Sequence, residues 1–212
     1  MSDRLVIAEA GEEAARSALD RCIRGGGVAV FPADTLYGLA CDPLDREAIE
    51  RIHALKGRDE GKPSAVMFFS PLAMRGLVAT LGSRTRDALG VLLPGPVTAI
   101  VHNPERLYPL ACREDPERLG VRLIEGPLSG AASAVLQTSA NPSGGPAPRR
   151  FEEVDRAIVS GAELAIDGGE LRGEPSTVVD LTRIESDREW RVLRRGAIGE
   201  SEIERQLAAI WT

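Results

Sequence analysis

Lysine is almost absent from this chain. Of its 26 basic residues, only Lys56 and Lys62 are lysine, and all the others are arginine. Both lysines fall in one short segment, KGRDEGK. A lysine ammonium is a compact charge, and a guanidinium does not replace it where an anion must be met at one point. The clustering of the two lysines therefore predicts an anion-binding site in this segment.

Several features that would place the chain at a membrane or outside the cell are also lacking. No run approaches the roughly 18 apolar residues of a membrane-spanning helix, and the first residues lack the basic-then-apolar pattern of a secretory signal. The three cysteines are scattered without a metal or redox spacing, which favours a reducing compartment. We therefore expect a cytoplasmic protein that makes no membrane contact.

Basic residues are fewer than acidic residues, 26 against 32. The formal net charge of −6 argues against a general nucleic-acid binder, although it is compatible with a local basic cleft. Histidine is scarce as well: His53 lies within a predicted helix and His102 just past a predicted strand, so we interpret both as structural.

Short apolar runs alternate with amphipathic segments along the chain, as in an α/β protein. Strands are expected at 5–7, 28–31, 65–69, 97–101, 120–123, 135–138, 164–167, 178–181 and 190–193. Helices are expected at 12–24, 45–55, 71–81, 83–92, 151–160 and 201–211, three of them capped by Asp45, Ser70 and Ser83. The length of 212 residues and the 43% hydrophobic content suit one domain over residues 1–212, with a twisted sheet of parallel and antiparallel strands flanked by helices.

The segment FPADTLYGLACD, residues 31–42, places Asp34, Thr35 and Tyr37 directly after an apolar strand. One interpretation is an ordinary connection from a strand to the next helix. The other is a ligand-binding shelf at the carboxyl end of a strand, where open α/β sheets place their sites. The residues of this segment alone favour the ordinary connection.

Other strand ends carry polar or basic clusters of the same kind. Ser139, Asn141, Arg149 and Arg150 lie in TSANPSGGPAPRR, Ser176 and Thr177 in GEPSTVVDL, and Arg194 and Arg195 in VLRRGAI. Hydroxyls, an amide, bare glycine backbone and guanidinium groups together could hold a nucleotide. The segment GRDEGKPS is not a phosphate-binding P-loop, because its spacing is one residue short and Pro63 stands where a helix should open.

Seven motifs in order resemble the YrdC-like family of threonylcarbamoyl-AMP synthases, in its short, single-domain form. They are FPADTLYGLACD, LKGRDEGKPSAVMF, LLPGPVTAIV, GVRL, TSANPSGGPAP, DGGELRGEPSTVVDL and VLRRGAI, and they span about residues 26–198. The resemblance implies that L-threonine, bicarbonate and ATP, with Mg²⁺, condense to threonylcarbamoyl-AMP and pyrophosphate. A downstream tRNA threonylcarbamoyl transferase complex would then modify tRNA.

The resemblance also implies roles for individual residues. Threonine would contact Thr35, Arg122, Ser139 and Ser176. ATP would contact Lys56, Arg58, Lys62, Asn141, Arg149 and Arg194, of which Lys56 and Arg58 would be catalytic. No residue of the protein is expected to hold a metal.

Three departures from the family pattern bear on threonine recognition more than on nucleotide binding. Met67 stands where many members carry a histidine that touches the substrate, and a thioether cannot donate a hydrogen bond. The stretch between Arg122 and Ser139 is shorter than usual, so that a helix there is expected to be truncated. Arg195 replaces a usual proline and adds charge.

Two alternatives belong to other functional classes. A non-catalytic RNA-binding module would use the basic face for weak contacts with tRNA or double-stranded RNA, but an acidic chain with 4% aromatic residues offers little stacking surface. A carbamoyl-transfer enzyme uses a related domain, although that form normally sits inside a much larger chain with zinc-finger and acylphosphatase-like parts.

Overall fold

The computed structural model describes residues 3–57 and 63–211 of the chain. Ten strands are found in these residues: β1 (Asp3–Val6), β2 (Ala29–Pro32), β3 (Tyr37–Cys41), β4 (Ala65–Phe68), β5 (Val97–His102), β6 (Arg118–Leu123), β7 (Val135–Ser139), β8 (Leu164–Asp167), β9 (Thr177–Asp180) and β10 (Arg191–Arg194). They form one sheet in the order β1-β8-β2-β3-β7-β4-β6-β5-β9-β10.

The helices among the described residues are short to medium in length. They are α1 (Ile7–Ala10), α2 (Glu12–Arg24), α3 (Arg46–Lys56), α4 (Pro71–Val78), α5 (Ser83–Leu92), α6 (Pro109–Cys112), α7 (Arg156–Gly161), α8 (Ile184–Asp187) and α9 (Glu200–Ala208), with a 3₁₀ turn at Phe151–Glu153. None of these helices has the length and apolar character needed to cross a membrane.

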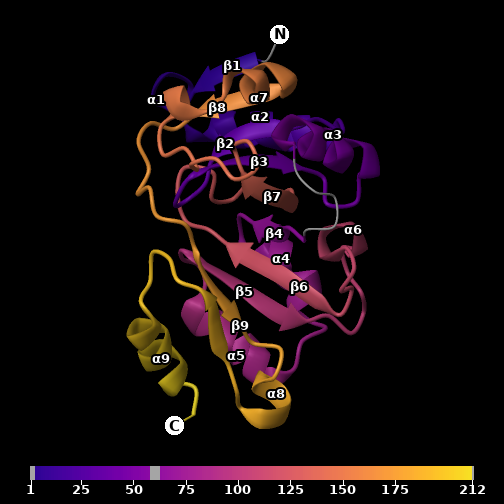
Figure 1. The fold of residues 1–212 in the computed structure, drawn as a ribbon, viewed down its shortest axis with the longest axis vertical. Coiled ribbons are helices and arrows are strands. Elements are labelled where there is room, and N and C mark those ends of the chain that lie inside the picture. The colour runs from indigo at the N-terminus through magenta and orange to yellow at the C-terminus, as the bar shows by residue number, and fades with distance from the viewer. Residues whose placement is uncertain (1–2, 58–62, 212) are drawn as a thin grey trace.

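The sheet mixes parallel and antiparallel pairs, which confirms the expected α/β fold class. Strands β1, β8 and β2 are parallel neighbours, β3 and β7 are antiparallel to their neighbours, and β5 runs parallel to β9. Figure 1 shows the sheet running the length of the molecule, with the N-terminus at one end and α9 near the other. The strands therefore connect both ends of the chain into one continuous layer.

The two faces of the sheet are covered unequally. Because side chains alternate along a strand, Val30 packs on one face of β2 and Phe31 on the other. The face of Val30 packs against helices along the whole sheet, from Ile52 of α3 to Leu207 of α9. The face of Phe31 packs against α2 over the strands at the N-terminal end. Among the described residues, no helix of this second apolar cluster covers the rest of that face.

Most expected elements are confirmed within one or two residues, and α2 and β8 match their expected bounds. The segment after β2 differs from the expectation of a connection to a helix. Residues 33–36 form a hairpin loop, in which the Ala33 N–H donates to the Leu36 carbonyl oxygen at 3.2 Å, and Tyr37 opens strand β3. All five residues of β3 are buried, so the strand shows no alternation of polar and apolar residues. A short apolar run of this kind does not distinguish a buried strand from a helix in the sequence.

The helix caps are confirmed at two of three positions. Asp45 accepts from the Ala48 N–H at 3.0 Å, and Ser70 accepts from the Ala73 N–H at 3.2 Å. The expected Ser83 cap is wrong, because α5 begins at Ser83 itself and its cap residue, Gly82, has no side chain. Glu185 supplies the missing acceptor from a distant segment, taking the Thr85 N–H at 2.7 Å. The expected helix at 151–160 divides into a 3₁₀ turn and α7.

Glu185→Ala should reveal this remote cap. Removing the carboxylate leaves the first turn of α5 without its acceptor, which should lower the free energy of unfolding by about 1 kcal/mol. Urea unfolding of the variant and the wild type measures the difference. Glu189→Ala is the control, because it removes only an exposed ion pair with Arg183 and should change stability by less than about 0.5 kcal/mol. Equal losses in the two variants would contradict the capping role.

Candidate active site

A cavity of about 620 Å³ lies over the part of the sheet that α2 leaves uncovered. Its floor is formed by β4, β5, β6 and β9, whose alternate residues face it: Thr98 and Ile100 line the cavity, whereas Val97, Ala99 and Val101 pack in the core. The 33–36 hairpin loop, the loop after β7 and the end of β10 complete its walls. The site is therefore built from segments far apart in the sequence.

Six residues expected at the substrates line this one cavity. They are Thr35, Arg122, Ser139, Asn141, Ser176 and Arg194. They come from the hairpin loop, two strands, two strand-end loops and the edge strand β10. The tertiary structure thus brings together the clusters that the sequence places at separate strand ends, although their contacts with a substrate remain a prediction.

Arg122 is the most deeply buried cation of the cavity wall, with 3% of its surface exposed. Its Nη2 donates to Asp34 Oδ1 at 2.5 Å, and its Nη1 lies 3.5 Å from Gln137 Oε1. Burial lowers the pKa of the Arg122 guanidinium and raises the pKa of Asp34, while the charge of each partner opposes these shifts. The pair therefore forms a desolvated ionic site whose interactions with a further charge are stronger than in water.

The Arg122–Asp34 pair also leaves hydrogen-bonding capacity unused. Arg122 Nε and Asp34 Oδ2 are buried, and neither has a hydrogen-bond partner among residues 3–57 and 63–211. Such groups carry a desolvation penalty and are uncommon in protein interiors. Their retention at the wall of a cavity is typical of a functional site rather than of a stabilising ion pair.

Ser176 and Arg194 form a second polar group on the cavity wall. The Ser176 hydroxyl lies 2.8 Å from Thr98 Oγ1, and Arg194 Nη2 donates to the Ser176 carbonyl oxygen at 2.8 Å and to its hydroxyl at 3.1 Å. The bonds from Arg194 hold the residue that precedes β9 against β10. A hydroxyl and a guanidinium consequently face the same space as Arg122.

Lys56 closes α3 and lies beneath the loop that follows β7. With 4% of its surface exposed, its ammonium donates to the carbonyl oxygens of Ser139 and Asn141, the latter at 2.6 Å, and lies 3.4 Å from Asn141 Oδ1. The Ser143 N–H in turn donates to the Lys56 carbonyl oxygen at 2.7 Å. Lys56 is not among the cavity-lining residues, and in this structure its charge positions the loop that carries Ser139 and Asn141.

The remaining expected residues lie at the margin of the site or outside the described part. Arg149 does not line the cavity, and its guanidinium pairs with Glu170 at 3.4 Å and Glu153 at 3.9 Å. Arg58 and Lys62 lie outside the described residues. The structure therefore leaves the predicted ATP contacts of these three residues untested.

Sequence reasoning missed several side chains of the cavity. Thr98, Asp115 and Arg118 line the cavity and were not expected there. Asp34, which pairs with the cavity residue Arg122, was noted only as part of a turn, and the two residues are 88 positions apart. The alternation of β5 and β6 could have indicated Thr98 and Arg118, since both share a strand face with residues of the site.

The departures from the family pattern have visible structural consequences. Met67 is fully buried in the apolar cluster with Phe31 and Phe69 and is not among the cavity-lining residues. Residues 124–134 between β6 and β7 are all described, and they contain no helix. Arg195 is largely exposed and lies 3.6 Å from Glu200.

His53, which we interpret from the sequence as structural, is buried, and its ring lies 3.1 Å from the Arg113 guanidinium.

A sequence model of the Sua5/YciO/YrdC family, described as telomere recombination, matches residues 21–196. This chain belongs to the Sua5/YciO/YrdC family. Among curated members, threonylcarbamoyl-AMP synthase of Pyrococcus abyssi is 33% identical over 199 residues, covering 89% of this chain and 56% of that protein. This chain therefore spans just over half the length of that relative. The threonylcarbamoyl-AMP synthase of Nitrosococcus oceani is 34% identical, covering 76% of this chain and 89% of its own length.

Solved structures of the family share the fold. P. abyssi Sua5 complexed with L-threonine superposes with a TM-score of 0.82 at 27% identity, covering 97% of this chain and 60% of its own. E. coli YciO gives a TM-score of 0.79 at 25% identity, covering 96% of this chain and 99% of its own. The fold of this Sua5/YciO/YrdC member is thus confirmed over nearly its whole length.

Lys56→Met should show whether the ammonium maintains the loop after β7. The variant keeps a flexible stem but leaves the Ser139 and Asn141 carbonyls without their donor, which should lower the free energy of unfolding by roughly 1–3 kcal/mol. Urea unfolding measures the loss. Arg46→Met, which removes an exposed cation from the first turn of the same helix, should stay within about 0.5 kcal/mol. An equally small effect at Lys56 would contradict this structural role.

Proposed function

We propose that this chain is an L-threonylcarbamoyladenylate synthase. The nitrogen of L-threonine and bicarbonate form a carbamate with loss of water, and a carbamate oxygen then attacks the α-phosphorus of ATP. The bond between the α-phosphorus and the bridging oxygen breaks, so that threonylcarbamoyl-AMP forms and pyrophosphate leaves. The observation that carries the proposal is the convergence of Thr35, Arg122, Ser139, Asn141, Ser176 and Arg194 on one cavity. The names of the relatives and the L-threonine complex of P. abyssi Sua5 support it.

The chemistry demands cations and positioning more than a covalent catalyst. A carbamate and a polyphosphate are both anionic, and bringing them into contact requires fixed positive charge in a water-poor site. Arg122, held in place by Asp34, is suited to the carboxylate of threonine because a guanidinium binds carboxylates through paired hydrogen bonds. Thr35, Ser139 and Ser176 line the same cavity and carry hydroxyls for threonine. Arg194, on the edge strand β10, is proposed to bind the nucleotide.

The ATP assignments of Lys56, Arg58, Lys62, Asn141 and Arg149 form part of the same proposal. Lys56 reaches a phosphate only by exchanging one of its carbonyl partners for a phosphate oxygen, so its catalytic role requires a rearrangement of the loop after β7. Arg149 likewise must leave Glu153 or Glu170. Both exchanges are electrostatically reasonable, because a polyphosphate carries more charge than a carbonyl or a single carboxylate.

Mg²⁺ is proposed to enter with ATP rather than to occupy a site on the protein. Among residues 3–57 and 63–211, no group of three or more histidine, cysteine, aspartate or glutamate side chains is arranged to hold a metal ion. The carboxylates near the cavity are engaged by arginines, as in Asp34 with Arg122 and Asp115 with Arg118. These residues do not fit a resident metal, and no catalytic step is assigned to one.

The product of this reaction is a mixed anhydride, which water hydrolyses. We propose that it is consumed in the cytoplasm by a tRNA threonylcarbamoyl transferase complex that transfers the threonylcarbamoyl group to an adenosine of tRNA.

Pyrophosphate release should require threonine and bicarbonate together. Purified protein with ATP and Mg²⁺ should release pyrophosphate only when both are present, and mass spectrometry should detect threonylcarbamoyl-AMP in the same reaction. Equal release when either substrate is omitted would contradict the proposal. Activity with carbamoyl phosphate in place of bicarbonate would favour a carbamoyl-transfer enzyme, and tRNA binding without any pyrophosphate would favour an RNA-binding module.

Arg122→Lys should separate threonine recognition from nucleotide binding. The ammonium keeps the charge opposite Asp34 but loses the paired geometry, so the KM for threonine should rise at least about tenfold. The Kd for ATP should stay within about twofold. Steady-state kinetics and calorimetric titration measure the two constants. Arg106→Lys is the control, because Arg106 pairs with Glu117 in an exposed position. An unchanged threonine KM in Arg122→Lys would contradict its assignment.

A further inference from the structure

The cavity has two chemically different ends, joined by strand β6. Arg118 and Arg122 both line it from the same face of this strand, four residues apart, which separates their Cα atoms by roughly 13 Å. Arg122 and Arg194 give one end an excess of positive charge over Asp34. At the other end Arg118 and Arg191 are balanced by Asp115 and Asp180. An anionic group is therefore favoured at the first end and a neutral group at the second.

The floor between the two ends is apolar. It is formed by Ala65, Ile100, Gly120 and Val178, one residue from each of four strands. Gly120 lies between the two arginines on the same strand face, and any side chain at this position would project into the cavity. Its ideal Cβ would lie 3.4 Å from Ile100 Cδ1 and 3.5 Å from Ala65. The absence of a side chain leaves a surface on which a planar ring can lie.

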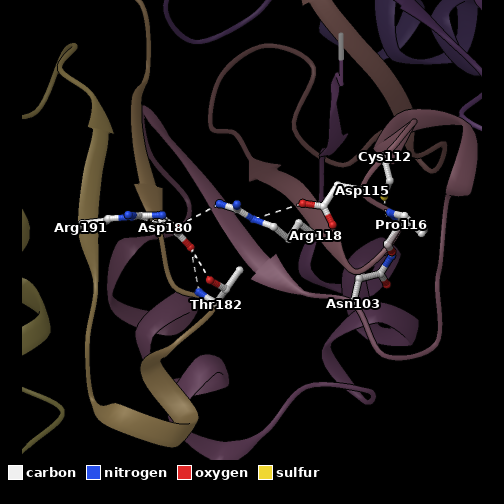
Figure 2. Close-up of polar contacts among 8 residues, drawn as sticks. All are labelled: Asn103, Cys112, Asp115, Pro116, Arg118, Asp180, Thr182 and Arg191. Atoms are coloured by element: carbon white, nitrogen blue, oxygen red, sulfur yellow. Dashed lines mark hydrogen bonds and ion pairs between the residues drawn. The ribbon is translucent and has the colours of Figure 1, made fainter. Parts of the chain in front are cut away.

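Asp115 and Arg118 stand side by side at the neutral end, one an acceptor and the other a donor. A turn holds them together, because the Arg118 N–H donates to the Asp115 carbonyl oxygen at 3.1 Å. Asn103, which is fully buried, fixes this turn by donating to the Pro116 carbonyl oxygen at 2.9 Å. Figure 2 shows Arg118 between Asp115 and Asp180. The backbone of this turn therefore holds the two residues next to each other.

Asp180 holds Arg118 but does not depend on it. Its Oδ2 accepts from Arg118 at 2.9 Å and from Arg191 at 3.2 and 3.0 Å, while its Oδ1 accepts from the Thr182 hydroxyl at 2.7 Å (Figure 2). Although burial alone would raise the pKa of Asp180, the hydrogen bonds from Thr182 and Arg191 and the charge of Arg118 lower it. Asp180 therefore remains ionised and partnered when Arg118 also binds a ligand.

We propose that Asp115 and Arg118 recognise the 6-aminopurine ring of the nucleotide. The ring lies on the Ala65–Ile100–Gly120–Val178 floor, the Asp115 carboxylate accepts from its amino group, and the Arg118 guanidinium donates to the adjacent ring nitrogen. The phosphates then extend toward Arg194, at the end of the cavity where Arg122 is proposed to hold threonine. This inference rests on the proposed function, which supplies the nucleotide, and adds the residues that select its base.

Arg191 provides a matched control, since both arginines bond to Asp180 Oδ2 but Arg191 is not among the cavity-lining residues. The probes are ATP, purine riboside triphosphate, which lacks the 6-amino group, and inorganic pyrophosphate. They are titrated calorimetrically into the wild type, Asp115→Ala, Arg118→Gln and Arg191→Gln. Thermal melts of all four proteins establish that each is folded, and Asp115→Ala changes only an exposed side chain.

The wild type should bind ATP about fivefold more tightly than the analogue, the worth of one hydrogen bond. Asp115→Ala should abolish this preference, and Arg118→Gln should weaken both nucleotides about fivefold. Arg191→Gln should leave both Kd values within twofold, and pyrophosphate binding should be the same in all four proteins. If Arg118 only supported Asp180, then Arg191→Gln, which removes two hydrogen bonds to it, would weaken ATP at least as much.

Three results would overturn the inference: no preference for the amino group in the wild type, equal nucleotide losses in Arg118→Gln and Arg191→Gln, or weaker pyrophosphate binding in Arg118→Gln. The last result would identify Arg118 as a phosphate ligand. Failure of the wild type to bind ATP at all would overturn the proposed function together with this inference. Threonine-dependent and bicarbonate-dependent pyrophosphate release without a base preference would leave the proposed function standing and reject the base-recognition role alone.

Discussion

Unequal coverage of one ten-stranded sheet is the constraint on which the rest of this structure depends. One face is buried under helices from end to end, and an apolar cluster extends along it. The other face is closed by α2 over the N-terminal strands, and the strands beyond carry threonine, glycine and arginine toward a cavity. A strand that is buried on one face and open on the other alternates between apolar and polar residues. The site lies over the strands that α2 does not cover.

Arginine–carboxylate pairs organise both ends of this cavity, but they do so at different degrees of burial. The Arg122–Asp34 pair is almost fully enclosed, and two of its polar atoms have no hydrogen-bond partner within residues 3–57 and 63–211. Such a pair contributes little to stability. Arg118 instead bridges a buried aspartate and an exposed one. Arg122 and Asp34 place two opposite charges in a desolvated position. Arg118 places a hydrogen-bond donor beside the acceptor Asp115.

The preference for arginine in this chain makes its lysines informative. Beneath the loop after β7, the compact ammonium of Lys56 meets three oxygen atoms of Ser139 and Asn141, an arrangement that suits a point charge better than a planar guanidinium. Lys56 links α3 to the loop that presents two cavity residues. Lys56, which the sequence predicts to bind an anion, thus donates to oxygen atoms of the protein, and any contact with phosphate must compete with them.

The sequence by itself determined the secondary structure to a large extent, because its signals are local. Helix α2 follows from the spacing of Ala15, Leu19 and Ile23, and the family motifs identified the clusters that line the cavity. Only the tertiary structure decided which of these residues meet. The Glu185 cap of α5 and the Arg122–Asp34 pair join residues that are 100 and 88 positions apart in the sequence. No local pattern encodes such pairings, since they depend on strand order and on which side of each strand faces the core.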